Sequence, residues 1–176
     1  KMLTHTLVHR KGFAKRFKQE ARSVANLSHE HIVRVYDTEA AYGTHFIVME
    51  RLRGTLLEDI LESRTRLAWG AIRRILKEVR RALHYSHEKD LLHRDIKPSN
   101  VFLTEGRRVK ILDFGIAVAK NSVADDGGML LGTPYYMSPE QSRGDALDGR
   151  TDLYSLGIVA YELVTGDVPF DAQSLE

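Results

Sequence analysis

A short stretch of the chain gathers charged and amide side chains between two hydrophobic runs. In LLHRDIKPSNVFL, residues 91–103, a histidine, an arginine, an aspartate, a lysine and an asparagine occur close together. Polar groups at the end of an apolar run lie where the backbone leaves the core, so their side chains can face a cleft. Asp95 and Asn100 offer oxygen ligands, and Asp113 follows another apolar run in ILDFG. Hard oxygen donors of this kind suit Mg²⁺ that carries phosphates.

The same stretch also supplies a cation and a candidate proton acceptor. Lys97 stands two positions after Asp95 and adds the positive charge that a transferring phosphoryl group requires. One carboxylate could accept a hydroxyl proton while the other oxygen donors hold a metal ion. These residues would then supply the groups that catalyse phosphoryl transfer. The residues therefore predict a phosphoryl-transfer site.

The elements that must position these residues follow from the hydrophobic periodicity. We predict helices over residues 12–28, 55–63, 68–89 and 151–166. We predict strands over residues 31–37, 44–50, 100–103 and 109–114, with turns at 38–43 and 104–108 and a loop from 119 to 139. A strand-rich beginning followed by a helical remainder fits two unequal lobes that meet near ERLRG, residues 50–54.

Two motifs in the right order carry a family resemblance. HRDIKPSN and DFG resemble the catalytic-loop and metal-binding signatures of the eukaryotic-type (Hanks-type) serine/threonine protein kinases, in wording closest to the bacterial members. SPE at 138–140 resembles the A-P-E motif, and GTPYYMSPEQ resembles the substrate-docking segment of serine/threonine kinases. TDLYSLGIVAYELVTGDVPF resembles the helix that forms the floor of the large lobe, so the resemblance covers essentially the whole chain.

The resemblance implies an α+β, bilobal protein-kinase-like fold that is truncated at both ends. Residues 1–52 would form a partial N-lobe and residues 53–176 a partial C-lobe. The sequence contains no G-x-G-x-x-G, the glycine-rich flap that covers the ATP phosphates in the family. It also stops before the helices that supply an arginine partner for Glu140 of the SPE motif. We expect Glu140 to lack that partner, and a buried carboxylate so deprived would cost about 3–5 kcal/mol.

The resemblance also implies a role for each residue of the catalytic loop. Asp95 would be the catalytic base that orients the substrate hydroxyl, and Lys97 would stabilise the charge on the transferred phosphoryl group. Asn100 and Asp113 would hold Mg²⁺. Arg94 would be the basic partner of the activation segment. The implied reaction is ATP-dependent phosphoryl transfer to serine or threonine hydroxyls of protein substrates, with ATP and Mg²⁺ as cofactors.

Further roles fall on residues outside the catalytic loop. The resemblance implies that Thr133 hydrogen-bonds near Asp95 and that Asp152 braces the catalytic loop from below. It implies that Lys1 is the strand lysine and Glu20 its helix partner. The nucleotide pocket would be lined by the side chains of Met49 and Phe102 and by the backbone from Glu50 to Leu52.

Four features of the sequence can be interpreted without a role in catalysis or in metal or phosphate binding. Lys1 could be a surface lysine, because the residues of the V-A-I-K motif before it are absent. Glu20 could be a solvated helix residue beside Arg16. His84 and His87 have a helical spacing open to a metal, but without a third ligand we interpret them as part of a structural helix. GGMLLGT has the glycine spacing of a phosphate loop and lacks its lysine, so we exclude it.

The activation segment raises a separate hypothesis. Between Gly115 and Thr133 the only hydroxyl side chain is Ser122, while Asp125 and Asp126 stand where such kinases keep their phosphoacceptor. The two carboxylates would then partly replace a phosphate in attracting the catalytic-loop arginine, although each carries one charge against roughly two for a phosphate. The alternative is a solvated acidic loop.

Composition limits the other classes of function. The 176 residues are 43% hydrophobic and 28% charged, and a net charge of +2 does not indicate nucleic-acid binding. The absence of cysteine excludes disulfides and thiolate metal sites and fits a reducing, cytoplasmic compartment. No run approaches the roughly 18 apolar residues of a membrane span, so an anchor in the parent protein would lie outside these residues. A non-catalytic, kinase-like binding module remains the alternative to an enzyme.

Overall fold

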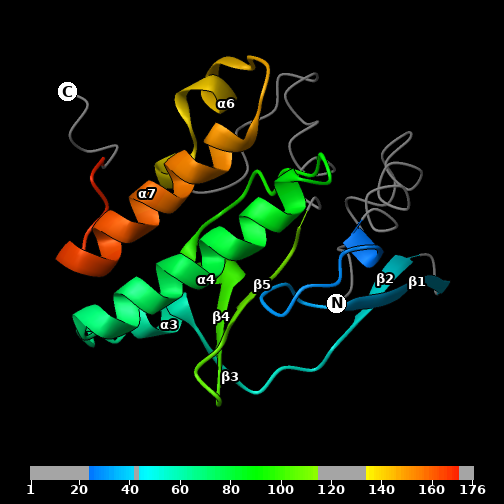
Figure 1. Cartoon of the computed structure of the whole chain (residues 1–176), viewed down its shortest axis with the longest axis horizontal. Coiled ribbons are helices and arrows are strands. Elements are labelled where there is room, and N and C mark those ends of the chain that lie inside the picture. Colours follow the sequence, from blue (N-terminus) through cyan, green and yellow to red (C-terminus); the bar gives the residue numbers. More distant parts are fainter. Residues whose placement is uncertain (1–23, 42–43, 115–133, 171–176) are drawn as a thin grey trace.

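The computed structural model describes residues 24–41, 44–114 and 134–170 (Figure 1). Along the chain run β1 (Val35–Ala41), β2 (Thr44–Met49), β3 (Gly54–Leu56), α3 (Leu57–Glu62), α4 (Trp69–His87), the 3₁₀ helix η1 (Pro98–Asn100), β4 (Val101–Thr104), β5 (Val109–Ile111), the 3₁₀ helix η3 (Pro134–Tyr136), α6 (Pro139–Arg143) and α7 (Gly149–Thr165). The described strands form a two-stranded sheet, β1-β2, and a three-stranded sheet, β3-β4-β5. This mixture confirms the α+β class.

The long helix α4 lies at the centre of the larger part of the molecule. It packs against α7 on one side and against β5 on the other (Figure 1). Its apolar residues recur at helical spacing and are buried: Ile72, Ile75, Val79, Ala82 and Leu83. The prediction of a helix over 68–89 is confirmed, because this periodicity is strong enough to be seen in the sequence alone.

The first hairpin differs from its prediction. We predicted a strand over 31–37 and a turn over 38–43, but β1 continues to Ala41 and pairs antiparallel with β2, from Val35 opposite Met49 to Ala41 opposite Thr44. The segment TEAA has weak strand propensity, and pairing with β2 overrides it. The residues before β1 join the other sheet instead, since Val33 N donates to Ile111 O and Ile111 N donates to His31 O.

The strand β3 was missed, because we predicted one helix over 55–63. The chain first forms β3, in which Leu56 lies opposite Phe102 of β4, and only then turns into α3. Gly54 makes this pairing possible: its φ is +147°, and a Cβ there would lie 2.0 Å from Leu103 O. A close backbone approach between segments so far apart in sequence leaves no periodic signal.

The helix α7, which we predicted over 151–166, packs against α4. Its buried residues include Leu156, Val159 and Leu163. Asp148 caps its first turn by accepting a hydrogen bond from Arg150 N, and hydrogen bonds from Arg150 lower the pKa of Asp148 to about 2. The helix ends at Gly166, whose φ is +92°.

The short helix α6 begins at the end of the predicted loop. The Ser138 side chain accepts a hydrogen bond from Gln141 N and so caps the helix. Within the described ranges, no helix has the length and apolar character needed to cross a bilayer. The lobe boundary at residue 52 stays a prediction.

Candidate active site

The catalytic-loop backbone is held from below by one buried carboxylate. Asp152 is fully buried in α7, and its two oxygens accept hydrogen bonds from His93 N at 2.9 Å and Arg94 N at 2.7 Å. His87 Nε2, at the end of α4, donates to the same carboxylate at 2.8 Å. Burial alone would raise the pKa of Asp152, but these hydrogen bonds and the charge of His93 outweigh it and lower the pKa. The ionised carboxylate holds Arg94 in a left-handed conformation, with φ of +65°.

The candidate base and a candidate metal ligand are in direct contact. Asn100 Nδ2 donates to Asp95 Oδ2 at 3.0 Å and to Asp95 O at 2.7 Å. Lys97 Nζ lies 3.0 Å from Asp95 Oδ1, and both side chains are about one quarter to one third exposed, at 26% and 31%. The amide of Asn100 therefore fixes the carboxylate from one side while the ammonium of Lys97 faces it from the other.

The second carboxylate reaches the same region through the β4-β5 pair. Val101 lies opposite Ile111, and Leu112 N donates to Asn100 O at 2.9 Å. Asp113 is the next residue and has a φ of +57°, a conformation that non-glycine residues adopt mostly at turns and functional sites. The residue before Asp113 is therefore paired with Asn100, and the binding of one Mg²⁺ by Asn100 and Asp113 stays a prediction.

Phe114, the residue after Asp113, packs against the catalytic loop. Phe114 is fully buried, and its ring meets the ring of His93 edge to face at 4.6 Å between centroids. His93 Nε2 donates to Leu112 O at 2.8 Å. The two motifs that suggested the family are thus joined by a hydrogen bond and a ring contact, which the spacing in the sequence did not reveal.

The predicted nucleotide-lining residues lie near the junction of the two sheets. Met49 ends β2 and Phe102 lies in β4, both partly buried. Lys110, opposite Phe102 in the β4-β5 register, bonds Glu50 at 2.6 Å. Glu50 N donates to Arg34 O, and the contact of the backbone of residues 50–52 with an adenine stays a prediction.

Several predicted residues lie outside the described part of the chain. These are Lys1, Glu20, Ser122, Asp125, Asp126 and Thr133. Their proposed roles, including the replacement of a phosphate by the two aspartates, stay predictions.

The expectation that Glu140 is a buried carboxylate was wrong, while its lack of an arginine partner stays a prediction. Its carboxylate is partly exposed rather than buried, and Thr151 Oγ1 donates to it at 2.8 Å. A backbone N–H and the Thr151 hydroxyl are the leading causes that lower the pKa of Glu140. The sequence also gave no signal for Gln141, whose Nε2 donates to Arg94 O at 2.9 Å and so ties α6 to the catalytic loop.

The plainer interpretation of the helical histidines is confirmed. His87 bonds Asp152, and His84 lies 3.6 Å from Glu88 on the surface. Among the described residues, no group of three or more histidine, aspartate or glutamate side chains could hold a metal ion.

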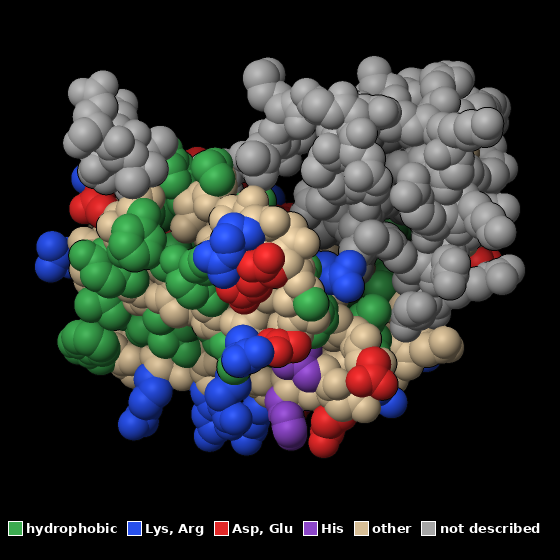
Figure 2. Space-filling view, turned by 90° about the horizontal axis from the view of Figure 1, so that it is seen from above, with side chains coloured by type: hydrophobic (Ala, Val, Ile, Leu, Met, Phe, Trp, Pro, Cys, Tyr) green, Lys and Arg blue, Asp and Glu red, His purple; other side chains and the backbone are tan. Residues whose placement is uncertain are grey.

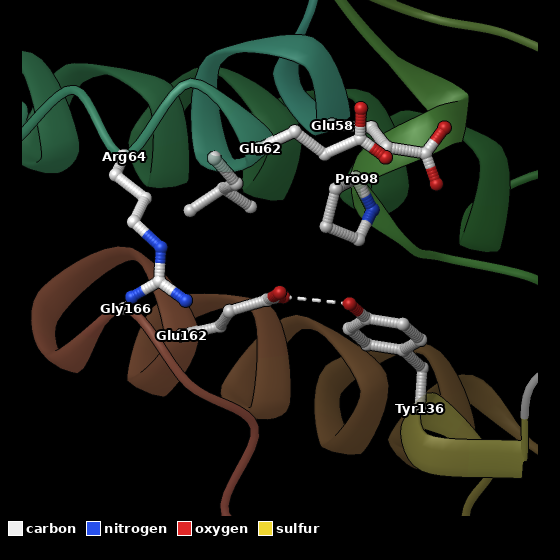
Figure 3. Close-up of a pocket in the computed structure, with 8 residues that line it drawn as sticks. Glu58, Glu62, Arg64, Pro98, Tyr136, Glu162 and Gly166 are labelled. Carbon is white, nitrogen blue, oxygen red and sulfur yellow. Dashed lines mark hydrogen bonds between the residues drawn. The ribbon is translucent and has the colours of Figure 1, made fainter.

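A pocket of about 300 Å³ opens beside the catalytic loop (Figure 3). It lies between α3 and α7, and Pro98 of η1 lines it. Tyr136 Oη donates to Glu162 Oε2 at 2.6 Å across its floor. Burial, then the neighbouring charges of Glu58 and Asp167, raise the pKa of Glu162 despite the bond from Tyr136. None of the predicted nucleotide-binding residues lines this pocket.

Comparison with known proteins places this geometry in a family. The chain matches the protein kinase domain family over residues 1–176. It is 41% identical over 175 residues to a probable serine/threonine-protein kinase of Clostridium perfringens and 39% identical over 184 residues to the serine/threonine-protein kinase PknB of Mycobacterium tuberculosis. These alignments cover 99% of the chain but only 26% and 29% of the relatives, so the chain spans little more than a quarter of their length.

A solved structure agrees with the sequence comparison. The kinase domain of Mycobacterium tuberculosis PknI superimposes with a TM-score of 0.81 at 34% identity, covering 100% of this chain and 66% of that one. The fold and the paired motifs define a protein kinase domain. The chain belongs to the protein kinase family, and its resemblance to the bacterial, Hanks-type serine/threonine kinases is confirmed.

Proposed function

We propose that this chain is the catalytic core of a protein kinase that transfers the terminal phosphoryl group of ATP to serine or threonine hydroxyls of protein substrates. The observation that carries the proposal is the contact between Asn100 and Asp95, together with the backbone bond from Leu112 to Asn100. These bonds support the proposal, because they join Asn100 to Asp95 and set the backbone of Leu112, the residue before Asp113, beside Asn100. Because such a reaction consumes ATP, we place it in the cytoplasm, as the lack of cysteine also favours.

The residues fit a magnesium–nucleotide complex. The amide nitrogen of Asn100 is committed to Asp95, which leaves the amide oxygen as a hard donor for a cation. Asp113, the residue after Leu112, supplies the second oxygen ligand. A bound Mg²⁺ would neutralise phosphate charge there. Met49, the backbone of Glu50 and Leu52, and Phe102 would hold the adenine.

The remaining steps belong to the side chains of the loop. Asp95, fixed by Asn100, would accept the proton of the substrate hydroxyl as the hydroxyl oxygen bonds to the γ-phosphorus of ATP. The bond from that phosphorus to the bridging oxygen of the β-phosphate would break, and ADP would leave. Lys97 would stabilise the negative charge of the transferred group, since its ammonium already faces Asp95. Asp152 would keep the loop backbone in place through both steps, and Thr133, Lys1, Glu20 and Arg94 keep the roles predicted for them.

Two variants separate this enzyme from a kinase-like binding module. Asp95→Asn should lower phosphotransfer from labelled ATP to a basic protein by about 10²–10⁴-fold, because it removes the base. It should leave Mg²⁺-dependent ATP binding measurable. Asp113→Ala should remove both. Undiminished phosphotransfer by Asp95→Asn would overturn the proposed role, and absence of ATP binding by the wild-type protein would favour the binding module.

A further inference from the structure

The outward surface of α4 carries a row of cations. Arg73, Lys77, Arg80 and Arg81 are all exposed. Their spacings of three, four and seven residues place them on one side of the helix, within roughly a third of its circumference. The buried residues of α4 lie on the opposite side, against α7 and β5. We call this surface, together with the exposed Trp69 at its beginning, the basic face.

The charge on the basic face has little to balance it. The single acidic residue within α4 is Glu78, which is 5% exposed and accepts a hydrogen bond from Val109 N on the inner side. Of the ion pairs formed among the described residues, none involves the four cations of the basic face. The chain as a whole has 26 basic and 24 acidic residues, so this excess is local to one helix.

An exposed aromatic ring stands at one end of the row. Trp69 is 72% exposed, more than any other large hydrophobic side chain among the described residues. It precedes Arg73 by one helical turn and therefore lies on the same side of α4. Indole rings are enriched where a membrane meets water, because one part of the ring system is apolar and its N–H seeks a polar partner.

The shape of the basic face favours a flat, anionic partner. Blue Lys and Arg side chains project along the lower edge of Figure 2, beside purple His side chains. From Trp69 to Arg81 the basic face is roughly 18 Å long, at 1.5 Å per residue. A row of cations with an exposed indole at one end matches an anionic lipid surface, where headgroup phosphates lie beside an apolar boundary.

We propose that the basic face docks on the surface of an anionic phospholipid bilayer. Arg73, Lys77, Arg80 and Arg81 would meet headgroup phosphates, and the indole of Trp69 would enter the boundary between headgroups and acyl chains. His87, whose ring bonds Asp152 beneath the catalytic loop, lies at the C-terminal end of α4, beyond the four cations. The inference does not depend on phosphoryl transfer.

The test is co-sedimentation of the protein with vesicles at about 0.1 M salt, where the Debye length is about 10 Å. One set of vesicles is pure phosphatidylcholine and the other contains one third phosphatidylglycerol. The protein should sediment with the anionic vesicles only, and higher salt should release it. Arg73→Glu with Lys77→Glu should weaken partitioning by at least roughly 25-fold, at roughly fivefold for each cation lost.

Two matched variants serve as controls, and circular dichroism checks that every variant is folded. Arg107→Glu with Arg143→Glu changes the net charge equally at exposed positions away from α4 and should sediment like the wild type. Arg73→Lys with Lys77→Arg should also retain binding. Equal sedimentation with both vesicle types, or an equal loss in the control pair, would overturn the proposal. So would binding to duplex DNA or polyglutamate without binding to anionic vesicles.

Discussion

Removal of the Asp152 carboxylate should destabilise the protein more than any surface change. In Asp152→Ala the N–H groups of His93 and Arg94 lose their acceptor inside a buried site, and His87 loses the bond to its ring nitrogen. Each orphaned, buried donor costs about 1–3 kcal/mol, and breaking a buried charged contact typically costs 3–5 kcal/mol. We therefore expect a loss of about 3–5 kcal/mol, a large share of the 5–15 kcal/mol that stabilises a typical domain.

The assay is urea denaturation followed by far-ultraviolet circular dichroism, with the free energy of unfolding extrapolated to water. Asp145→Ala is the matched control, since it removes an aspartate that pairs with Arg143 on the surface and should cost less than about 1 kcal/mol. A free energy of unfolding for Asp152→Ala within 1 kcal/mol of the control would refute the claim that this carboxylate holds the catalytic loop.

Two further outcomes follow from the described residues. Gly54→Ala should cost about 1–3 kcal/mol in the same urea assay, because of its φ of +147° and the 2.0 Å approach to Leu103 O. Gly70→Ala in α4 meets nothing within 4 Å and should stabilise by about 0.5–1 kcal/mol, so equal effects of the two changes would contradict the reasoning. The lowered pKa of Asp152 means that its contribution is present above the unfolded value of about 3.9 and is lost as the pH falls through the folded value. The stability gap between wild type and Asp152→Asn should therefore shrink when urea curves are recorded at successively lower pH below about 4, and a gap that widens would contradict this sign.

Much of the fold could be predicted from the sequence where a local pattern decides the structure. The periodicity of α4 and the continuous apolar character of α7 are enough to place each helix within a few residues. Long-range pairing is different: β3 forms because Leu56 meets Phe102, and nothing near Leu56 in the sequence encodes that. The same holds for the end of β1, which β2 determines.

In the candidate site, too, local features could be predicted from the sequence and long-range contacts could not. The residue types of Asp95, Asn100 and Asp113 predict their chemistry, and the two strands that separate Asn100 from Asp113 were also predicted and pair as β4 and β5. The bond from Gln141 to Arg94 joins a side chain to a backbone carbonyl 47 positions away, and a carbonyl has no residue-specific signature. The partner of Glu140 was missed for a similar reason, since the threonine hydroxyl that bonds it lies on a different helix.

The most direct test of a shared magnesium site is a double-mutant cycle in Mg·ATP binding, measured by titration calorimetry. The variants are Asn100→Ala, Asp113→Asn and their combination. If both side chains hold the same ion, their effects should be coupled by about 0.5–3 kcal/mol. Effects that add to within about 0.5 kcal/mol would show that the two residues act independently, and would contradict a single cation site between the catalytic loop and β5.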